Sequence, residues 1–160
     1  MLKLFGICIL LFTSMLISRE LADARRRRLA LCEELLRFLS FLRLQIGCFL
    51  RPISEIACEF RSSTLSACGF LKDGGVEDLS VAFSSSDAPR IAGKECTRII
   101  ESLFTSLGAG YLDNEIGIID AHRAELTELV EVERTEAARQ IRLIRTLTAS
   151  AAVGLIILII

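Results

Sequence analysis

Residues 112–160 read LDNEIGIIDAHRAELTELVEVERTEAARQIRLIRTLTASAAVGLIILII, and the rest of the chain is organised around this stretch. No glycine or proline lies between Ile118 and Val153, so nothing there breaks or kinks a helix. Acidic residues come first and basic residues later, which suits the helix macrodipole, and the chain carries no charge from Leu147 onward. The stretch predicts one helix, about 70 Å long at about 1.5 Å per residue, that leaves water and ends in a membrane.

The N-terminal end is also apolar. Residues 2–17 contain few polar side chains, and the cluster Arg25–Arg28 follows them closely. A signal peptide cleaved after Ala24 would have this length, but four arginines directly behind the cleavage site oppose translocation. We therefore favour an uncleaved membrane helix whose arginines stay in the cytoplasm.

Arginines flank both apolar ends on the side of the central region. Arg139, Arg142 and Arg145 precede the last apolar segment, just as Arg25–Arg28 follow the first one. By the positive-inside rule, both flanks place residues 19–145 in the cytoplasm. The cell membrane is therefore the expected location, with the soluble domain on its cytoplasmic side.

These patterns predict an all-α protein, with a cytoplasmic helical bundle between two membrane helices. The expected division is an N-terminal membrane helix over 1–18, a cytoplasmic helical domain over 19–145 and a C-terminal membrane segment over 146–160. The last segment is short for an unassisted span. Its small residues Ser150 and Gly154 would let it pack against residues 2–17 or against another subunit.

Shorter helices are expected within the central region. An apolar stripe with a period near 3.6 runs over 29–50 and predicts a helix that stops before Pro52. We expect Ser63 or Thr64 to cap the third helix, and a loop over 84–87 with Pro89. Residues 76–83 alternate partly and also fit a strand, but we favour a helix. The further helices are expected over 53–60, 63–71, 76–83 and 91–107.

The residues that could carry chemistry are few and scattered. The only histidine, His122, has no nucleophile motif around it, so a place on a helix surface or in a helix–helix contact is favoured over catalysis. The six cysteines stand singly, without a CxxC motif, and favour buried apolar positions over metal binding. We expect no enzyme activity, no cofactor and no nucleic-acid partner. The cysteines are Cys8, Cys32, Cys48, Cys58, Cys68 and Cys96.

Charged side chains on the long helix offer a candidate docking face. Acidic residues interleave there with arginines, a pattern that usually belongs to a solvated surface. The best candidates for contact with a partner protein are Glu125, Glu128, Glu131 and Arg134.

Several short segments, taken in order, are similar to one known family. One position differs: the family usually carries an acidic residue where this chain has Gln45. The segments are Met1-Leu-Lys-Leu-Phe-Gly6, Leu42-Arg-Leu-Gln-Ile46, Pro52-Ile-Ser-Glu-Ile56, Leu107-Gly108 with Asp113, and Ile144-Arg-Thr-Leu147 before the apolar end. Their order and spacing resemble stage III sporulation protein AB of endospore-forming bacteria.

The resemblance implies a helical cytoplasmic domain similar to those of type II secretion platform proteins. It implies a structural part of the channel complex between mother cell and forespore, in the mother-cell membrane around the forespore. The implied partners are the membrane, a secretion-type ATPase similar to stage III sporulation protein AA, and other channel subunits, with a homo-oligomer as one option. Two alternatives stay open: a small membrane-anchored dimeric regulator, and a secreted disulfide-bonded protein cleaved after Ala24.

Overall fold

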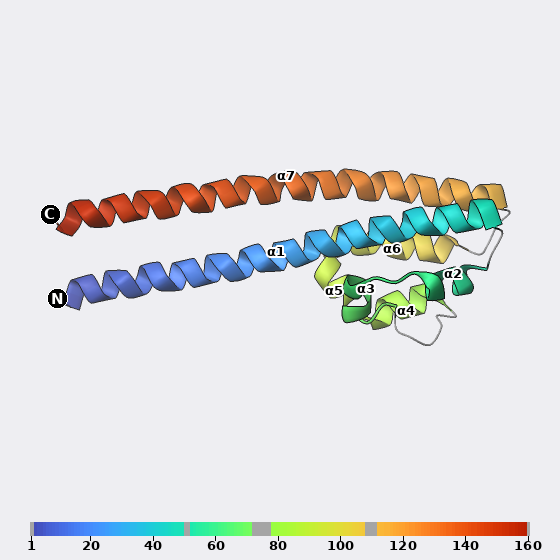
Figure 1. The fold of residues 1–160 in the computed structure, drawn as a ribbon, viewed down its shortest axis with the longest axis horizontal. Helices are drawn as coiled ribbons and strands as arrows, with labels where there is room; N and C mark the ends of the chain where they lie inside the picture. Colours follow the sequence, from blue (N-terminus) through green and yellow to red (C-terminus); the bar gives the residue numbers. More distant parts are fainter. Residues whose placement is uncertain (1, 50–51, 72–77, 108–111, 160) are drawn as a thin grey trace. The chain divides into compact units, whose positions relative to one another are not determined.

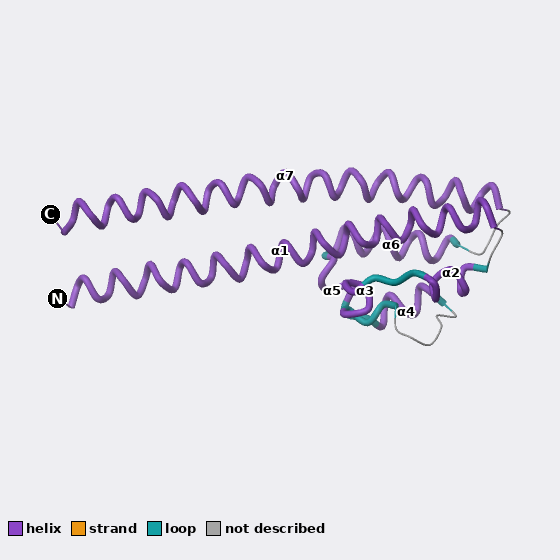
Figure 2. The backbone as a smooth tube through the Cα atoms, in the orientation of Figure 1, coloured by secondary structure: helices purple, strands orange, loops and turns teal. Residues whose placement is uncertain are grey.

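The structure is a computed structural model that describes residues 2–49, 52–71, 78–107 and 112–159, with only some side chains in the outer parts of the two long helices. The chain is all-α, and no strand occurs in the described ranges (Figures 1 and 2). The helices there are α1 (Leu2–Phe49), α2 (Ile53–Glu59), α3 (Ser63–Ala67), α4 (Leu79–Ser85), α5 (Ala88–Ala92), α6 (Lys94–Ser106) and α7 (Leu112–Ile159).

The chain divides into two units. The central unit is residues 27–132, and the terminal unit combines residues 1–26 with residues 133–160. The expected division at 18/19 and 145/146 stays a prediction.

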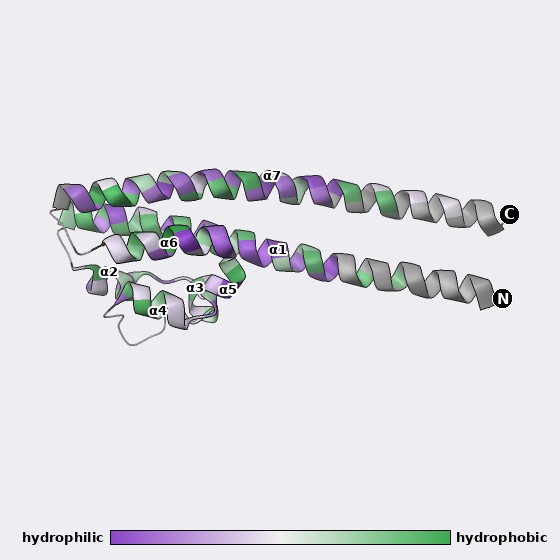
Figure 3. Ribbon diagram, turned by 180° about the vertical axis from the view of Figure 1, so that it is seen from behind, coloured by the Kyte–Doolittle hydropathy of each residue, from purple (hydrophilic) through white to green (hydrophobic). Residues whose placement is uncertain are grey.

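The core of the central unit forms around the apolar stripe of α1. Leu35, Leu39 and Leu42 are fully buried, as the 3.6-residue period predicts. Helix α6 buries Ile99, Ile100 and three further residues, Cys96, Leu103 and Phe104, and α4, α5 and α6 pack against one another. In Figure 3, hydrophobic and hydrophilic residues accordingly alternate along these helices.

An aromatic cluster joins the small helices to α1. Phe70, in the turn after α3, lies 5.9 Å from Phe38 of α1, 5.3 Å from Phe83 of α4 and 5.7 Å from Phe104 of α6, measured between ring centroids. The Phe38 and Phe83 rings meet Phe70 edge to face, a favourable geometry for aromatic pairs. One loop side chain therefore contacts three helices at once.

Local signals explain where most of the helices begin and end. Helix α1 ends before Pro52, and α2 begins directly after it, as predicted. Helix α4 has Asp78 as its N-cap, whose carboxylate accepts hydrogen bonds from the N–H groups of Ser80 and Val81. The helical interpretation of this segment is confirmed, although α4 begins later than predicted; residues 72–77 lie outside the described ranges.

Three predicted boundaries are wrong. The N-cap of α3 is Ser62, whose hydroxyl accepts from Leu65 N, and the helix stops at Ala67, well before residue 71. The expected loop over 84–87 is partly helical, because α4 continues to Ser85. Pro89 lies inside the first turn of α5, where its missing N–H costs nothing.

The predicted helix over 91–107 is interrupted at Gly93, which separates α5 from α6. Gly93 has φ 82° and ψ 165°, a region that only glycine adopts readily. A Cβ atom at this position would lie 2.8 Å from Cζ of Arg28. The glycine is therefore required both by the backbone and by the close approach of Arg28.

The terminal unit contains the outer parts of α1 and α7, whose ends N and C lie at the same end of the unit (Figure 1). Arg25 and Glu136 form an ion pair at 3.8 Å that connects the two helices. Among the residues that the structure describes, no helix offers a run long and apolar enough to span a membrane. The two membrane segments stay a prediction.

Candidate interaction site

The first part of α7 is held to α6 by charged side chains. Arg98 of α6 donates a hydrogen bond to Glu125 of α7 at 2.7 Å and contacts Glu95 at 3.3 Å. These hydrogen bonds, the one to Glu125 first, raise the pKa of Arg98. Glu125 is therefore engaged within the fold, which sequence reasoning missed because Arg98 is 27 positions away.

The predicted docking residues are distributed over both units. Glu128 and Glu131 are exposed on α7 in the central unit, as a docking face requires. Arg134 is also exposed but belongs to the terminal unit. On the central unit, Glu128 and Glu131 are therefore exposed members of the predicted face, while Glu125 contacts Arg98.

His122 lies in the contact between α6 and α7. Its Nδ1 is 2.9 Å from the carbonyl oxygen of Ile118, and its Nε2 is 3.3 Å from Oγ of Ser102. Since a carbonyl can only accept, Nδ1 donates to it, and the Ser102 hydroxyl is within hydrogen-bond distance of Nε2. This arrangement fits the interpretation of His122 as a helix–helix contact residue.

A second ion pair joins α1 to α7. Arg43 donates to the carboxylate of Asp120, and this hydrogen bond lowers the pKa of Asp120 below its ordinary value. The side chains are 44% and 41% exposed, so solvent screens the pair and its contribution to stability is small. The 77 positions between the partners hide this contact from sequence reasoning.

The arginine cluster does not act as one group. Arg28 is half-buried, with its guanidinium against the backbone of Gly93, and Arg25 pairs with Glu136. Arg26 and Arg27 are exposed. A role next to a membrane therefore remains open for these two exposed arginines, whereas Arg28 serves the packing of the central unit.

Residues near the C-terminal end were predicted to pack in the membrane. Ser150 is exposed, and its hydroxyl donates to the carbonyl oxygens of Thr146 and Leu147 in the preceding turn. Gly154 is exposed too, and a Cβ atom there would meet no described atom within 4 Å. The side chain of Arg145 lies outside the described residues. The predicted contacts of Ser150 and Gly154 with another helix stay predictions.

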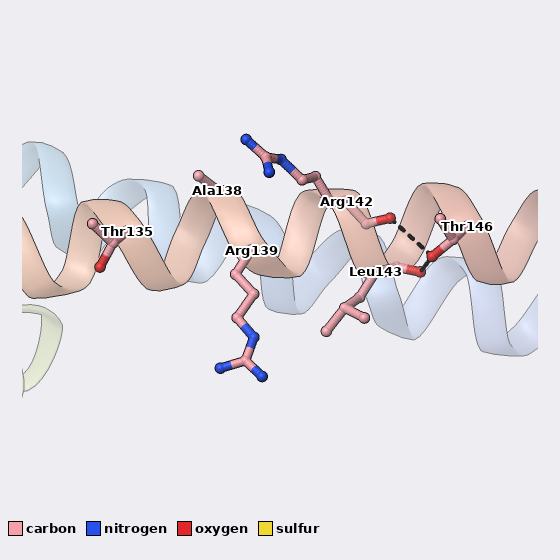
Figure 4. A pocket seen from close by; sticks show the side chains of 6 residues that line it. All are labelled: Thr135, Ala138, Arg139, Arg142, Leu143 and Thr146. Carbon is pink, nitrogen blue, oxygen red and sulfur yellow. Dashed lines mark hydrogen bonds between the residues drawn. The ribbon is translucent and has the colours of Figure 1, made fainter.

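An open groove of about 400 Å³ lies along α7 in the terminal unit. Figure 4 shows Arg139 and Arg142 extending to opposite sides of the helix, with Ala138 on the side of Arg142. Thr135, Leu143 and Thr146 complete the lining, and the Thr146 hydroxyl donates to the carbonyl oxygens of Arg142 and Leu143. The groove therefore combines small side chains with two cations, Arg139 and Arg142, which the sequence places beside the last apolar segment.

The cysteines and other donor groups form no metal site where the structure describes them. Cys32, Cys68 and Cys96 are buried and Cys48 and Cys58 exposed, all with free thiols; Cys8 lies outside the described side chains. Burial raises the pKa of the Cys68 thiol, which makes it unreactive. In the described ranges, no three histidine, cysteine, aspartate or glutamate residues cluster as metal ligands would.

Comparison with known proteins adds no identification. No family model matches the chain, and no curated protein or solved structure matches it.

Proposed function

We propose that the chain is a non-enzymatic platform in the cell membrane, a structural component of a secretion-like channel complex required for endospore formation. The observation that supports the proposal is that both apolar ends belong to one unit, as parts of the two 48-residue helices α1 and α7. Each helix also contributes to the central unit, through Leu35 and Leu39 of α1 and Leu126 of α7. The resemblance to stage III sporulation protein AB supports the same function.

In this function, the ends of α1 and α7 are the membrane helices and the central unit is the cytoplasmic domain. The central unit would dock a secretion-type ATPase, similar to stage III sporulation protein AA, together with other channel subunits. Such docking needs no catalytic group and no cofactor in this chain. It needs a folded surface, and the exposed carboxylates of Glu128 and Glu131 supply one.

The membrane topology can be tested with the chain's own cysteines. In a Cys8→Ser chain, we expect a membrane-impermeant maleimide to label Cys48 and Cys58 only after the cells are permeabilised. These two thiols are exposed, whereas those of Cys32, Cys68 and Cys96 are buried and react slowly. The measurement is the mass of the purified chain, which also reports whether residues 1–24 are retained.

A chain that also carries Cys48→Ser and Cys58→Ser is the control and should remain unlabelled in permeabilised cells. Labelling of Cys48 and Cys58 in intact cells, together with loss of residues 1–24, would contradict the proposal. That outcome would favour a secreted protein.

The docking face can be tested by charge reversal. In a Glu128→Arg/Glu131→Arg chain, we expect about 5-fold less of the secretion-type ATPase to co-purify. An acidic face suits a basic partner surface, and the two new arginines would repel that surface. Glu101→Arg, an exposed change on α6, is the matched control and should leave co-purification unaltered. Equal recovery of the ATPase with the double variant would exclude these residues from the docking site.

A further inference from the structure

We propose that the terminal unit binds a second copy of this chain head to tail, with the N-terminal part of α1 of one copy in the α7 groove of the next. The inference rests on the proposed function in one respect, since a membrane would hold neighbouring copies in the same orientation. All residues of this interface belong to the terminal unit.

The α1 side of this contact is one face of the helix. Phe12, Leu16, Glu20 and Asp23 follow one another at spacings of four, four and three, which places them on the same face. All four are exposed, Phe12 at 65% and Leu16 at 47%. Arg25 comes two residues after Asp23 and therefore points about 200° away at about 100° per residue. Since Arg25 pairs with Glu136 of the same chain, the face with Glu20 and Asp23 is turned away from that intrachain contact.

The α7 side is the groove with Arg139 and Arg142. These two arginines are three residues apart, as are Glu20 and Asp23. Within the described part of the chain, none of these four charged side chains forms an ion pair. The two surfaces therefore carry opposite charges at the same spacing.

The two pairs of charges also lie at the same level along the unit. The Arg25–Glu136 ion pair sets the register of α1 against α7, which run in opposite directions because both chain ends lie at one end (Figure 1). Asp23 lies two residues from Arg25 towards the N-terminus, and Arg139 lies three residues from Glu136 towards the C-terminus. Glu20 and Arg142 lie five and six residues from the same pair, so each carboxylate differs in level from its arginine by one residue. One residue is about 1.5 Å of helix rise. A neighbouring copy in the same orientation would thus present both carboxylates at the level of the two guanidinium groups, which flank the groove on either side.

Apolar side chains extend the match towards the chain ends. Leu143 and Leu147 are exposed on α7, at 52% and 67%. Counted in the same way, Leu16 lies at a level between them. Small side chains at Thr135 and Ala138 leave room for a second helix in the groove. Apolar burial would supply affinity, and the charge pairs would select the register.

Such an interface joins different surfaces of the two copies. Each copy therefore keeps one free α1 face and one free α7 groove, and repetition builds a ring or an open chain of subunits. A symmetric pairing of two grooves in the same orientation is disfavoured, because it would bring the arginines of both copies together.

Charge exchange between two variants tests the proposal. Variant one is Glu20→Arg/Asp23→Arg, and variant two is Arg139→Glu/Arg142→Glu, each made in the full-length chain in non-ionic detergent. We expect the wild type to self-associate, and each variant alone to need at least about 10-fold higher concentration. An equimolar mixture should regain wild-type association, because each α1 face then meets a groove of opposite charge. The measurement is molar mass by light scattering during gel filtration.

A matched control reverses two exposed carboxylates outside the interface, Glu101→Arg/Glu128→Arg, and should associate like the wild type. A monomeric wild type, or a mixture that stays dissociated, would overturn the inference; the second outcome would show that the charges act within one chain or on another partner such as a lipid. Alkaline carbonate extraction separates this test from that of the proposed function. If the chain is monomeric but stays in the membrane fraction, the head-to-tail interface is wrong and the proposed platform function is unaffected. If the chain self-associates but carbonate releases it from the membrane, the platform function is wrong and the interface is unaffected.

Discussion

Replacing Phe70 by alanine is expected to lower the free energy of unfolding of the central unit by about 3–5 kcal/mol. The side chain is 1% exposed and contacts the rings of Phe38, Phe83 and Phe104, which belong to three different helices. Alanine would leave a cavity where these helices meet, and the short helices could refill it only by shifting on α1. Because a small domain is stabilised by only about 5–15 kcal/mol in total, this loss is a large fraction of its stability.

The buried cysteines make this measurable in the full-length chain. The thiols of Cys32, Cys68 and Cys96 become reactive only when the central unit opens, so their labelling at increasing urea concentration reports its unfolding. Phe49→Ala removes the same ring from a side chain that is 62% exposed, and should change the midpoint little. Equal effects of the two substitutions would contradict the arrangement of the core.

Regular periodicity and single breaker residues made much of this fold predictable. The stripe of α1, the end of that helix before Pro52 and the buried face of α6 are all local patterns. The apolar stripe predicted over 29–50 extends to Phe49, which is 62% exposed. Phe49 is the last residue of α1, and a periodic pattern does not indicate where the packed core ends.

The contacts between helices were not predictable in the same way. Glu125 was predicted to bind a partner, but α6 places Arg98 within 2.7 Å of it. Asp120 and Arg43 likewise meet only once α1 and α7 pack together. A charged helix face has the same sequence pattern whether it is exposed to solvent, binds a partner or packs on another helix of its own chain. The sequence alone therefore could not distinguish these three environments.

The central position of Phe70 was equally hidden. The prediction placed it inside a helix over 63–71, whereas the chain turns after α3 and directs Phe70 towards α1. Gly93 was missed because an isolated glycine within a helical pattern is often tolerated. Its special role appears only in the dihedral angles and in the closeness of Arg28.

Replacing Gly93 by alanine is therefore expected to destabilise the central unit by about 1–3 kcal/mol. With φ 82° and ψ 165°, the residue lies in a region that is costly for any residue with a Cβ atom. The new methyl group would also meet the Arg28 guanidinium at 2.8–3.0 Å, and either Arg28 or the α5–α6 junction would have to move. Thiol labelling at increasing urea concentration measures the loss.

Replacing Gly117 by alanine is expected to raise the free energy of unfolding instead of lowering it. Gly117 is exposed within α7, and a Cβ atom there meets nothing within 4 Å, so alanine should stabilise the helix by about 0.5–1 kcal/mol.

Repeating Gly93→Ala in an Arg28→Ala background separates the two causes, because only the steric part of the cost can vanish there. A neutral Gly93→Ala would show that the chain can pass from α5 to α6 by another backbone path. A cost unchanged by Arg28→Ala would assign the whole effect to the dihedral angles.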